Sequence, residues 1–338
     1  MTLAANSVSR ALGAFYGLAM GDALGMPTQS LSREQIKARF GTLSTFEDAG
    51  PFQPIAPNMP KGSITDDTEQ AILVARLLIA GQGEIAPQAL ANSLIEWEAE
   101  MRAKGSHDLL GPSTKRAIEM ILSGHSVEEA GRYGTTNGAA MRITPVGIMA
   151  NIADAAAFMP KVLQACQVTH NTSLGIASAA AIAAVISSGI NGNDLSSALA
   201  VGIRAAYDGE RHGHWIAGGR IGPRIQWARQ LCADVDNSEL AELLYDVVGT
   251  SVASQESVVA AFALASQVAA EKLDPFAALC MAAGIGGDTD TIAAVLGAML
   301  GACGGMDIWP AELIEHLKAT NSLALEPLVE GLLAMRTP

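Results

Sequence analysis

Residues 286–305 read GGDTDTIAAVLGAMLGACGG, and this segment joins a cluster of oxygen ligands to a long apolar run. The pattern predicts a buried helix over Thr291 to Cys303, with Asp288 and Asp290 at its N-terminus. Far earlier in the chain, Thr65-Asp66-Asp67 leads into the apolar run Ala71 to Ala80 in the same manner. These two segments decide the expected fold, because both place acidic side chains at the start of a buried helix.

Both clusters pack hard oxygen ligands into one turn. Such ligands favour Mg²⁺, Mn²⁺ or Ca²⁺ over zinc, and the positive ends of helix dipoles favour carboxylates at the same positions. Plain helix capping is the alternative, but a cap needs one such residue and each cluster has several. We therefore expect the two segments to meet and form one dinuclear metal site.

Long alanine-rich segments with helical periodicity dominate the rest of the chain, and alternating β-branched runs are few. The pattern predicts an all-α protein whose main helices are Ser7 to Ala23, Thr68 to Ala80, Pro87 to Lys104, Ser113 to Ser123, Ala155 to Cys166, Leu174 to Ser188, Ser196 to Tyr207, Arg224 to Leu231, Leu240 to Val248, Glu256 to Glu271, Phe276 to Ala283, Thr291 to Cys303, Ala311 to Asn321 and Leu323 to Met335. Three segments are predicted as loops that are too long and too particular for connectors, and such loops are usually functional or disordered: Phe40 to Gly62, Gly131 to Pro145 and Gly209 to Pro223. No linker divides the chain, so residues 1–338 are expected to form one compact domain.

Composition narrows the classes of function. With 34 acidic and 21 basic residues, the formal charge is −13, which disfavours a nucleic-acid-binding protein. The uncharged run Thr172 to Ile190 is about long enough to span a bilayer, but its alanines, serines and glycines favour a close-packed central helix, and no membrane association is expected. The four scattered cysteines favour a reduced, cytoplasmic setting.

Five ordered motifs carry a resemblance to a known family. They are Gly21-Asp22-Ala23-Leu24-Gly25, Thr65-Asp66-Asp67-Thr68, Asn137-Gly138-Ala139-Ala140-Met141-Arg142, Thr169-His170 and Gly286-Gly287-Asp288-Thr289-Asp290-Thr291. Taken together and in this order, the chain resembles the ADP-ribosylglycohydrolase family, which includes the dinitrogenase-reductase-activating glycohydrolases. The resemblance implies an all-α glycosidase that uses two Mg²⁺ or Mn²⁺ ions to grip the vicinal hydroxyls of a ribose and to polarise water.

The same resemblance assigns residues to roles. The implied metal ligands form two groups, with Asp290 bridging them: Thr65, Asp66 and Asp67, and Asp288, Asp290 and Thr291. The implied substrate contacts are Asn137, Gly138, Ala139, His170 and Gly287, and the implied catalytic side chains are Asp66, Asp290 and Gln29. Arg142 has two open interpretations, a phosphate contact or an internal salt bridge with a metal-site carboxylate.

Two positions depart from the family pattern. Many members have Glu where this chain has Gln29, and some have Asp where it has Gly134. A Gln can orient water or bond a sugar hydroxyl, but it cannot act as a general base. A metal-bound hydroxide could supply that base, as could one of four carboxylates: Asp66, Glu34, Glu47 or Asp48.

Several functions are therefore open. The first is a metal-dependent hydrolase of an N- or O-ribosyl bond, acting on ADP-ribosylated protein (arginine or serine) or on a small ribosylated metabolite. The alternative is a non-catalytic or altered-specificity binder of ADP-ribose-like ligands, because of Gln29. A purely structural protein is disfavoured, since clustered carboxylates without cations repel one another. The oligomeric state and the choice between Mg²⁺ and Mn²⁺ are not evident from the sequence.

Overall fold

Helices provide nearly all regular structure in the computed structural model, which describes residues 5–103 and 110–337. Within these ranges, backbone pairing of the β type is limited to isolated bridges, such as Leu31 with Gly287 and Thr136 with Ala253. The all-α prediction is therefore confirmed. The helices are, in chain order, α1 (Ala5–Gly25), α2 (Arg33–Phe40), α3 (Asp66–Ala80), α4 (Pro87–Ala103), α5 (Pro112–Leu122), α6 (Val127–Ala130), η1 (Gly131–Tyr133), α7 (Gly138–Met141), α8 (Thr144–Met149), α9 (Ala155–His170), α10 (Ser173–Ile190), α11 (Leu195–Gly209), α12 (Ile221–Leu231), α13 (Asn237–Leu243), η2 (Leu244–Val248), α14 (Ser254–Ala269), α15 (Pro275–Gly284), α16 (Thr289–Gly304), η3 (Met306–Ile308), α17 (Ala311–Asn321) and α18 (Glu326–Ala334).

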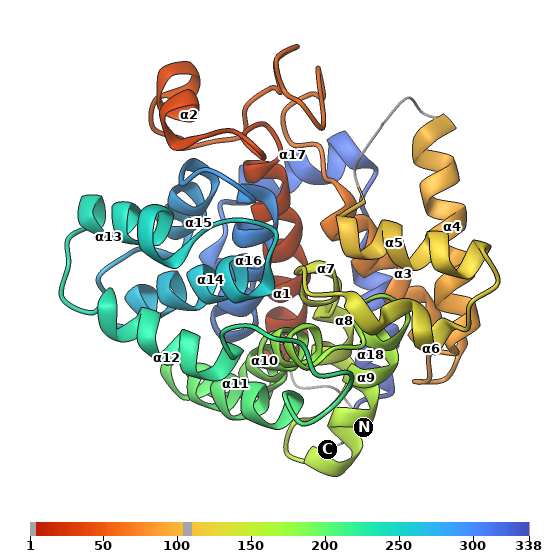
Figure 1. Cartoon of the computed structure of the whole chain (residues 1–338). Coiled ribbons are helices and arrows are strands. Elements are labelled where there is room, and N and C mark those ends of the chain that lie inside the picture. Colours follow the sequence, from red (N-terminus) through yellow and green to blue (C-terminus); the bar gives the residue numbers. More distant parts are fainter. Residues whose placement is uncertain (1–4, 104–109, 338) are drawn as a thin grey trace.

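Helices α1 and α16 pack against each other in the middle of the molecule (Figure 1). Glycines at every fourth position of α1, among them Gly17 and Gly25, let the two backbones touch. A Cβ atom built on Gly17 would lie 2.3 Å from the carbonyl oxygen of Gly297, and one on Gly25 would lie 2.3 Å from the Cα of Asp290. No side chain larger than hydrogen fits at these positions, so the glycines hold α16 at one place along α1.

Helix α10 is the other central element. Among the described residues it is the one helix long and apolar enough to cross a membrane by length and composition, and all 18 of its residues are buried inside the protein. It packs against α11 on one side and α16 on another. The prediction of a close-packed central helix is confirmed.

Several boundaries differ from the prediction. The expected loop Gly131 to Pro145 contains η1, α7 and the start of α8, because helices of three to six residues are too short to show a period. Helix α2 was not predicted, although Ser32 and Gln35 form a capping box at its start. The segments 41–65 and 210–220 are irregular as expected. The predicted end of the third helix segment, Lys104, lies outside the described residues.

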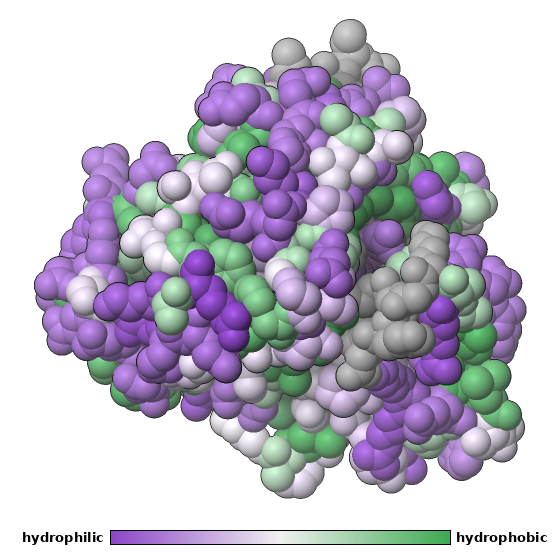
Figure 2. Space-filling view, turned by 90° about the horizontal axis from the view of Figure 1, so that it is seen from above, coloured by the Kyte–Doolittle hydropathy of each residue, from purple (hydrophilic) through white to green (hydrophobic). Residues whose placement is uncertain are grey.

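Hydrophilic residues cover much of the surface. The face seen in Figure 2 is mostly hydrophilic, with hydrophobic residues in small separate patches. Such scattering is ordinary for a protein surface.

Candidate functional site

A pocket of about 270 Å³ brings both acidic clusters together. We call it the aspartate pocket, and its lining comes from distant parts of the chain: Gln29, Ser30, Ile55, Asp66, Asp67, Leu110, Gly111, Pro112, Lys115, Thr136, Asn137, Gly138, Met141, Val252, Asp288, Asp290 and Thr291. The predicted meeting of the start of α3 with the start of α16 is therefore present in the fold.

Asp22 holds the start of α3 in place from behind the pocket. Its fully buried carboxylate accepts hydrogen bonds from the backbone N–H of Thr65 (2.9 Å) and of Thr68 (3.1 Å), and from both threonine hydroxyls. These are N–H groups that the first turn of a helix leaves without internal partners. The capping of α3 therefore comes from α1, and it frees Asp66 and Asp67 to face the pocket.

The start of α16 is held by other contacts. Asp290 lies against Gly25 of α1, as described above. Asp288 accepts a 2.5 Å hydrogen bond from the Asn137 amide, which also donates to Ser257. The Thr291 hydroxyl lies 3.3 Å from Oδ2 of Asp67 and so links α16 to α3.

Burial makes these carboxylates costly to ionise. Desolvation raises the pKa of Asp22 and of Asp288 to about 6. It raises the pKa of three others well above the usual range, assisted by repulsion from neighbouring carboxylates: Asp66, Asp67 and Asp290. Such a concentration of perturbed carboxyls marks candidate functional sites.

In two of these carboxylates, one oxygen also lacks a hydrogen-bond partner. Oδ1 of Asp67 and Oδ1 of Asp290 are buried and have no hydrogen-bond donor among the described residues. Buried polar atoms are nearly always satisfied, and unpartnered carboxylate oxygens fit a hard cation such as Mg²⁺ or Mn²⁺. The donor set is thus chemically suited to divalent cations.

The side chains do not, however, converge into a ready metal-binding group. Within the described ranges, no three His, Cys, Asp or Glu side chains form a group that could hold an ion. The dinuclear centre expected from the sequence is therefore not shown, although its acidic components line one pocket.

The predicted residues divide into those that line the pocket and those behind it. Lining it are Gln29, Asp66, Asp67, Asn137, Gly138, Asp288, Asp290 and Thr291; outside the lining are Thr65, Ala139, His170 and Gly287. Thr65 donates its hydroxyl to Asp22, and Gly287 pairs its backbone with Leu31. Of the four carboxylates considered as the base, Asp66 alone lines this pocket.

Arg142 takes neither of the two roles considered. It is fully buried, does not line the pocket, and forms no ion pair with a carboxylate among the described residues. Its guanidinium instead donates to the side-chain oxygen of Gln70, and the Gln70 amide lies 3.4 Å from Asp66. Gln70 thus stands between Arg142 and the carboxylate.

Comparison with known proteins supplies the decisive observation for the family. The family model described as ADP-ribosylglycohydrolase matches residues 3–338. The chain belongs to the ADP-ribosylglycohydrolase family. Members of this family are hydrolases that act on ADP-ribose linkages of the glycosidic type.

Individual relatives agree with this assignment. The chain is similar to YegU of Escherichia coli (strain K12), a protein named as uncharacterized, with 34% identity over 93% of each chain. It is also similar to the ADP-ribosylarginine hydrolase Tri1 of Pseudomonas putida (strain GB-1), with 26% identity over 92% of this chain and 75% of the relative. A solved structure titled as an ADP-ribosylglycohydrolase-related protein complex superposes with a TM-score of 0.67 at 23% identity, covering 98% of this chain and 99% of the other. At that identity the likeness shows the shared fold alone.

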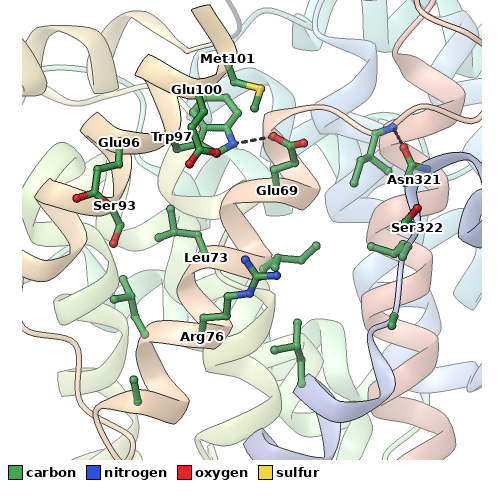
Figure 3. A pocket seen from close by; sticks show the side chains of 17 residues that line it. Glu69, Leu73, Arg76, Ser93, Glu96, Trp97, Glu100, Met101, Asn321 and Ser322 are labelled. Carbon is green, nitrogen blue, oxygen red and sulfur yellow. Dashed lines mark hydrogen bonds between the residues drawn. The ribbon is translucent and has the colours of Figure 1, made fainter. Parts of the chain in front are cut away.

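This ADP-ribosylglycohydrolase-family chain has a second, larger pocket on another face of α3. We call it the α3/α4 pocket; its volume is about 650 Å³, and Figure 3 shows its lining, with Arg76 and Glu69 on α3 and Trp97 on α4. Nε1 of Trp97 donates a 2.6 Å hydrogen bond to Glu69. None of the predicted site residues lines this pocket.

Two residues at the candidate site were given no individual role in the sequence analysis. Asp22 belongs to the Gly21-to-Gly25 motif, so its buried position under α3 could have been sought there. Thr136 precedes Asn137 in the same stretch and lines the pocket, but the sequence assigns no role to its side chain. Its environment is created by contacts with distant segments.

Proposed function

We propose that the chain is a metal-dependent hydrolase that cleaves the glycosidic bond at the ribose of ADP-ribosylated substrates. The observation that carries the proposal is the pair of unpartnered buried oxygens, on Asp67 and Asp290, in a pocket that four aspartates line. Buried carboxylates that repel one another destabilise a fold unless a cation or protons neutralise them. If these carboxylates bind divalent cations, their position in one pocket is accounted for.

The residues that would hold the cations are Thr65, Asp66, Asp67, Asp288, Asp290 and Thr291. Bound cations would supply charge stabilisation and would orient the hydroxyls of a sugar. The Thr65 hydroxyl donates its hydrogen to Asp22, so its oxygen keeps lone pairs for a cation. The contacts of Asp22 and Asn137 orient the acidic side chains before any ligand arrives.

The protein side chains would perform the remaining steps. Asp66 is the carboxylate we propose as the general base, because of the four carboxylates considered for this role it alone lines the pocket. Neighbouring carboxylates would stabilise the positive charge that develops at the anomeric carbon. Gln29, whose buried Nε2 has no partner among the described residues, would donate to an oxygen of the substrate or of the attacking water.

The substrate class follows from size and relatives. A pocket of about 270 Å³ is smaller than the roughly 300–1,000 Å³ typical of sites for drug-sized ligands. It would take the ribose and an adjoining group, while the rest of an ADP-ribosyl substrate extends outward. Since one relative is named an ADP-ribosylarginine hydrolase, ADP-ribosylated protein is the first substrate to test, and a small ribosylated metabolite is the second.

A direct assay separates these functions. Purified protein is incubated with Mg²⁺ or Mn²⁺ and, in turn, with ADP-ribosyl-arginine, ADP-ribosyl-serine and a nucleoside panel, and the released sugar is measured by chromatography. Turnover that chelation abolishes supports the hydrolase. Tight, metal-dependent binding of ADP-ribose without product, measured by calorimetry, would instead establish a non-catalytic binder. If the protein showed no turnover and no binding, the proposal would be refuted.

A further inference from the structure

A chain of buried hydrogen bonds runs from Arg142 to the aspartate pocket. The Nη2 group of Arg142 donates to the hydroxyl of Thr169 at 2.5 Å. That hydroxyl lies 2.7 Å from Nδ1 of His170, and Nε2 of the same ring lies 2.9 Å from the hydroxyl of Thr136. The first three side chains are buried behind the pocket, while Thr136 lines it.

Because the guanidinium of Arg142 can only donate, this series of hydrogen bonds has one direction. A guanidinium has donors only, so the Thr169 oxygen must accept from Arg142. The Thr169 hydrogen then has Nδ1 of His170 as its acceptor, and that nitrogen must carry no hydrogen. A neutral imidazole with a bare Nδ1 bears its hydrogen on Nε2 and donates it to the Thr136 oxygen.

The opposite direction leaves groups unsatisfied. If Nδ1 carried the hydrogen, the Thr169 oxygen would accept twice and its own hydrogen would have no acceptor among the contacts described. A doubly protonated ring is disfavoured as well, because burial and the nearby Arg142 charge hold the pKa of His170 well below its usual value. The arrangement that satisfies the buried Thr169 hydroxyl and both ring nitrogens of His170 therefore has Nε2–H of His170 donating to Thr136.

The Thr136 hydroxyl is consequently left with a hydrogen to donate. Its oxygen accepts from His170, and no other side-chain or backbone acceptor for it is recorded among the described residues. The residue is 8% exposed and contributes to the wall of the pocket. A nearly buried donor without an acceptor, facing a cavity, is chemically ready for a ligand oxygen.

The pocket wall around Thr136 indicates what kind of ligand oxygen would accept from its hydroxyl. The backbone N–H of Thr136 points to the hydroxyl of Ser113 (3.4 Å), in the first turn of α5. The same end of α5 lines the pocket through Gly111 and Pro112, and Lys115 on the next turn lines it too. A helix N-terminus and a lysine both favour an anion.

We propose that Thr136 is a substrate-binding residue whose hydroxyl, oriented by Arg142, Thr169 and His170, donates to a phosphate oxygen of the substrate. This inference rests on the proposed function, since it requires a phosphate-bearing ribosyl ligand in the pocket. His170 and Thr169 are positioning residues that act through Thr136. Because the Thr136 oxygen already accepts from His170, its hydroxyl is oriented to donate, and an ionised phosphate oxygen is a suitable acceptor.

Two variants of Thr136 test the contact. Thr136→Val removes the hydroxyl at nearly the same volume, and it should weaken ADP-ribose binding in the presence of Mn²⁺ about ten-fold or more, as expected for a lost hydrogen bond to a charged group. Thr136→Ser keeps the hydroxyl and should keep most of the affinity. Calorimetry with Mn²⁺ alone should give wild-type affinity for Thr136→Val, because the hydroxyl does not hold the cation; unchanged ADP-ribose binding by this variant would overturn the inference.

A pair of smaller ligands identifies the acceptor. Ribose 5-phosphate and ribose, competing with ADP-ribose, differ only in the phosphate group. Wild-type protein should prefer ribose 5-phosphate, and Thr136→Val should lose that preference. An equal loss for both sugars would show that the acceptor is not a phosphate oxygen.

The direction of the chain can be measured without any ligand. Nitrogen-15 NMR of the histidine rings should show His170 as the neutral form with hydrogen on Nε2 in the wild type, and Thr169→Val should disturb that form. Hydrogen on Nδ1 in the wild type would overturn the inference even if hydrolysis is observed. Failure of the proposed function is distinguishable, because a protein that binds no ADP-ribose can still show the Nε2–H form.

Discussion

Two pockets flank α3, and they differ in how their charges are balanced. The aspartate pocket is the smaller, about 270 Å³, and it holds buried carboxylate oxygens that have no partner. The α3/α4 pocket is larger, about 650 Å³, yet Glu69 accepts a hydrogen bond from Trp97, and its charged residues Arg76, Glu96 and Glu100 are exposed. Unfavourable charge that the fold retains therefore marks the smaller pocket, rather than the larger one, as the candidate site.

The largest expected effect comes from removing one charge in the aspartate pocket. Asp290→Asn should abolish measurable metal binding and lower hydrolysis by about 1,000-fold or more, roughly 4 kcal/mol of transition-state stabilisation. Calorimetry with Mn²⁺ and the ADP-ribosyl assay would measure the two losses. Glu96→Gln, the matched change in the α3/α4 pocket, should alter neither; full turnover by Asp290→Asn would remove the basis of the comparison.

Removal of the anchor behind the pocket should act mainly on stability. Asp22→Asn places an amide against the N–H groups of Thr65 and Thr68, which need an acceptor. We expect a loss of about 3 kcal/mol in the free energy of unfolding, measured by urea denaturation without metal. Asp48→Asn, at an exposed carboxylate that accepts from the backbone of Lys61, is the control and should lose about 1 kcal/mol or less. Equal losses in both variants would contradict the anchoring role.

The pH dependence of stability should separate metal-free from metal-bound protein. The folded-state pKa of Asp22 and of Asp288 is about 6, above the ordinary value of 3.8. The folded chain therefore binds more protons than the unfolded chain between these values, and the contribution of these groups to the free energy of unfolding falls as pH rises through that window. Thermal unfolding should accordingly show a stabilisation by Mg²⁺ or Mn²⁺ that grows from pH 5 to pH 7. A metal effect that does not change with pH would indicate that the carboxyls are not the ligands.

A change at Gln29 tests which residue limits the chemistry. Gln29→Glu introduces a carboxylate into the pocket, and we expect turnover of ADP-ribosyl-arginine to rise about ten-fold, since a positioned carboxylate can take a proton from water. Chromatography of released ADP-ribose measures it, and Gln29→Ala is the control for simple loss of the amide. No gain by Gln29→Glu, with metal binding intact, would favour Asp66 as a sufficient base.

The smallest effect belongs to the α3/α4 pocket. Trp97→Phe removes the 2.6 Å hydrogen bond to Glu69 and should cost about 1 kcal/mol of stability, with turnover unchanged. Urea denaturation and the ADP-ribosyl assay measure both. A large loss of turnover would mean that this pocket is coupled to the chemistry, and the contrast between the two pockets would fail.

The elements that sequence predicted best are those with a strong period or a dense motif. The runs that became α3, α10 and α16 are long and apolar, and the acidic clusters at two of them met as expected. The segment 131–145 was predicted as a loop, because the three- to six-residue helices within it show no period. Short helices of this kind are stabilised by tertiary packing rather than by local preference.

The positions of side chains within the site were harder to predict from the sequence. His170 was expected to contact substrate, and the fold buries it in contact with Thr136, a residue to which the sequence assigned no role. Arg142 was expected near a phosphate or a carboxylate, and Gln70 separates it from Asp66. These arrangements depend on contacts between residues tens of positions apart, and no local pattern encodes them.

The glycine contacts between α1 and α16 have a consequence for how the protein can change. Each residue advances a helix by about 1.5 Å, so an insertion or deletion upstream of Gly17 in α1 would be harmless only if the glycines kept facing Gly297. A slip of one position would bring the side chain of Tyr16 or Leu18 against the backbone at Gly297 and would displace Asp290, which lies against Gly25. The glycine contacts of helix α1 thus fix the position of Asp290 in the pocket. Variation in chain length should therefore be found in the surface loops rather than along this helix.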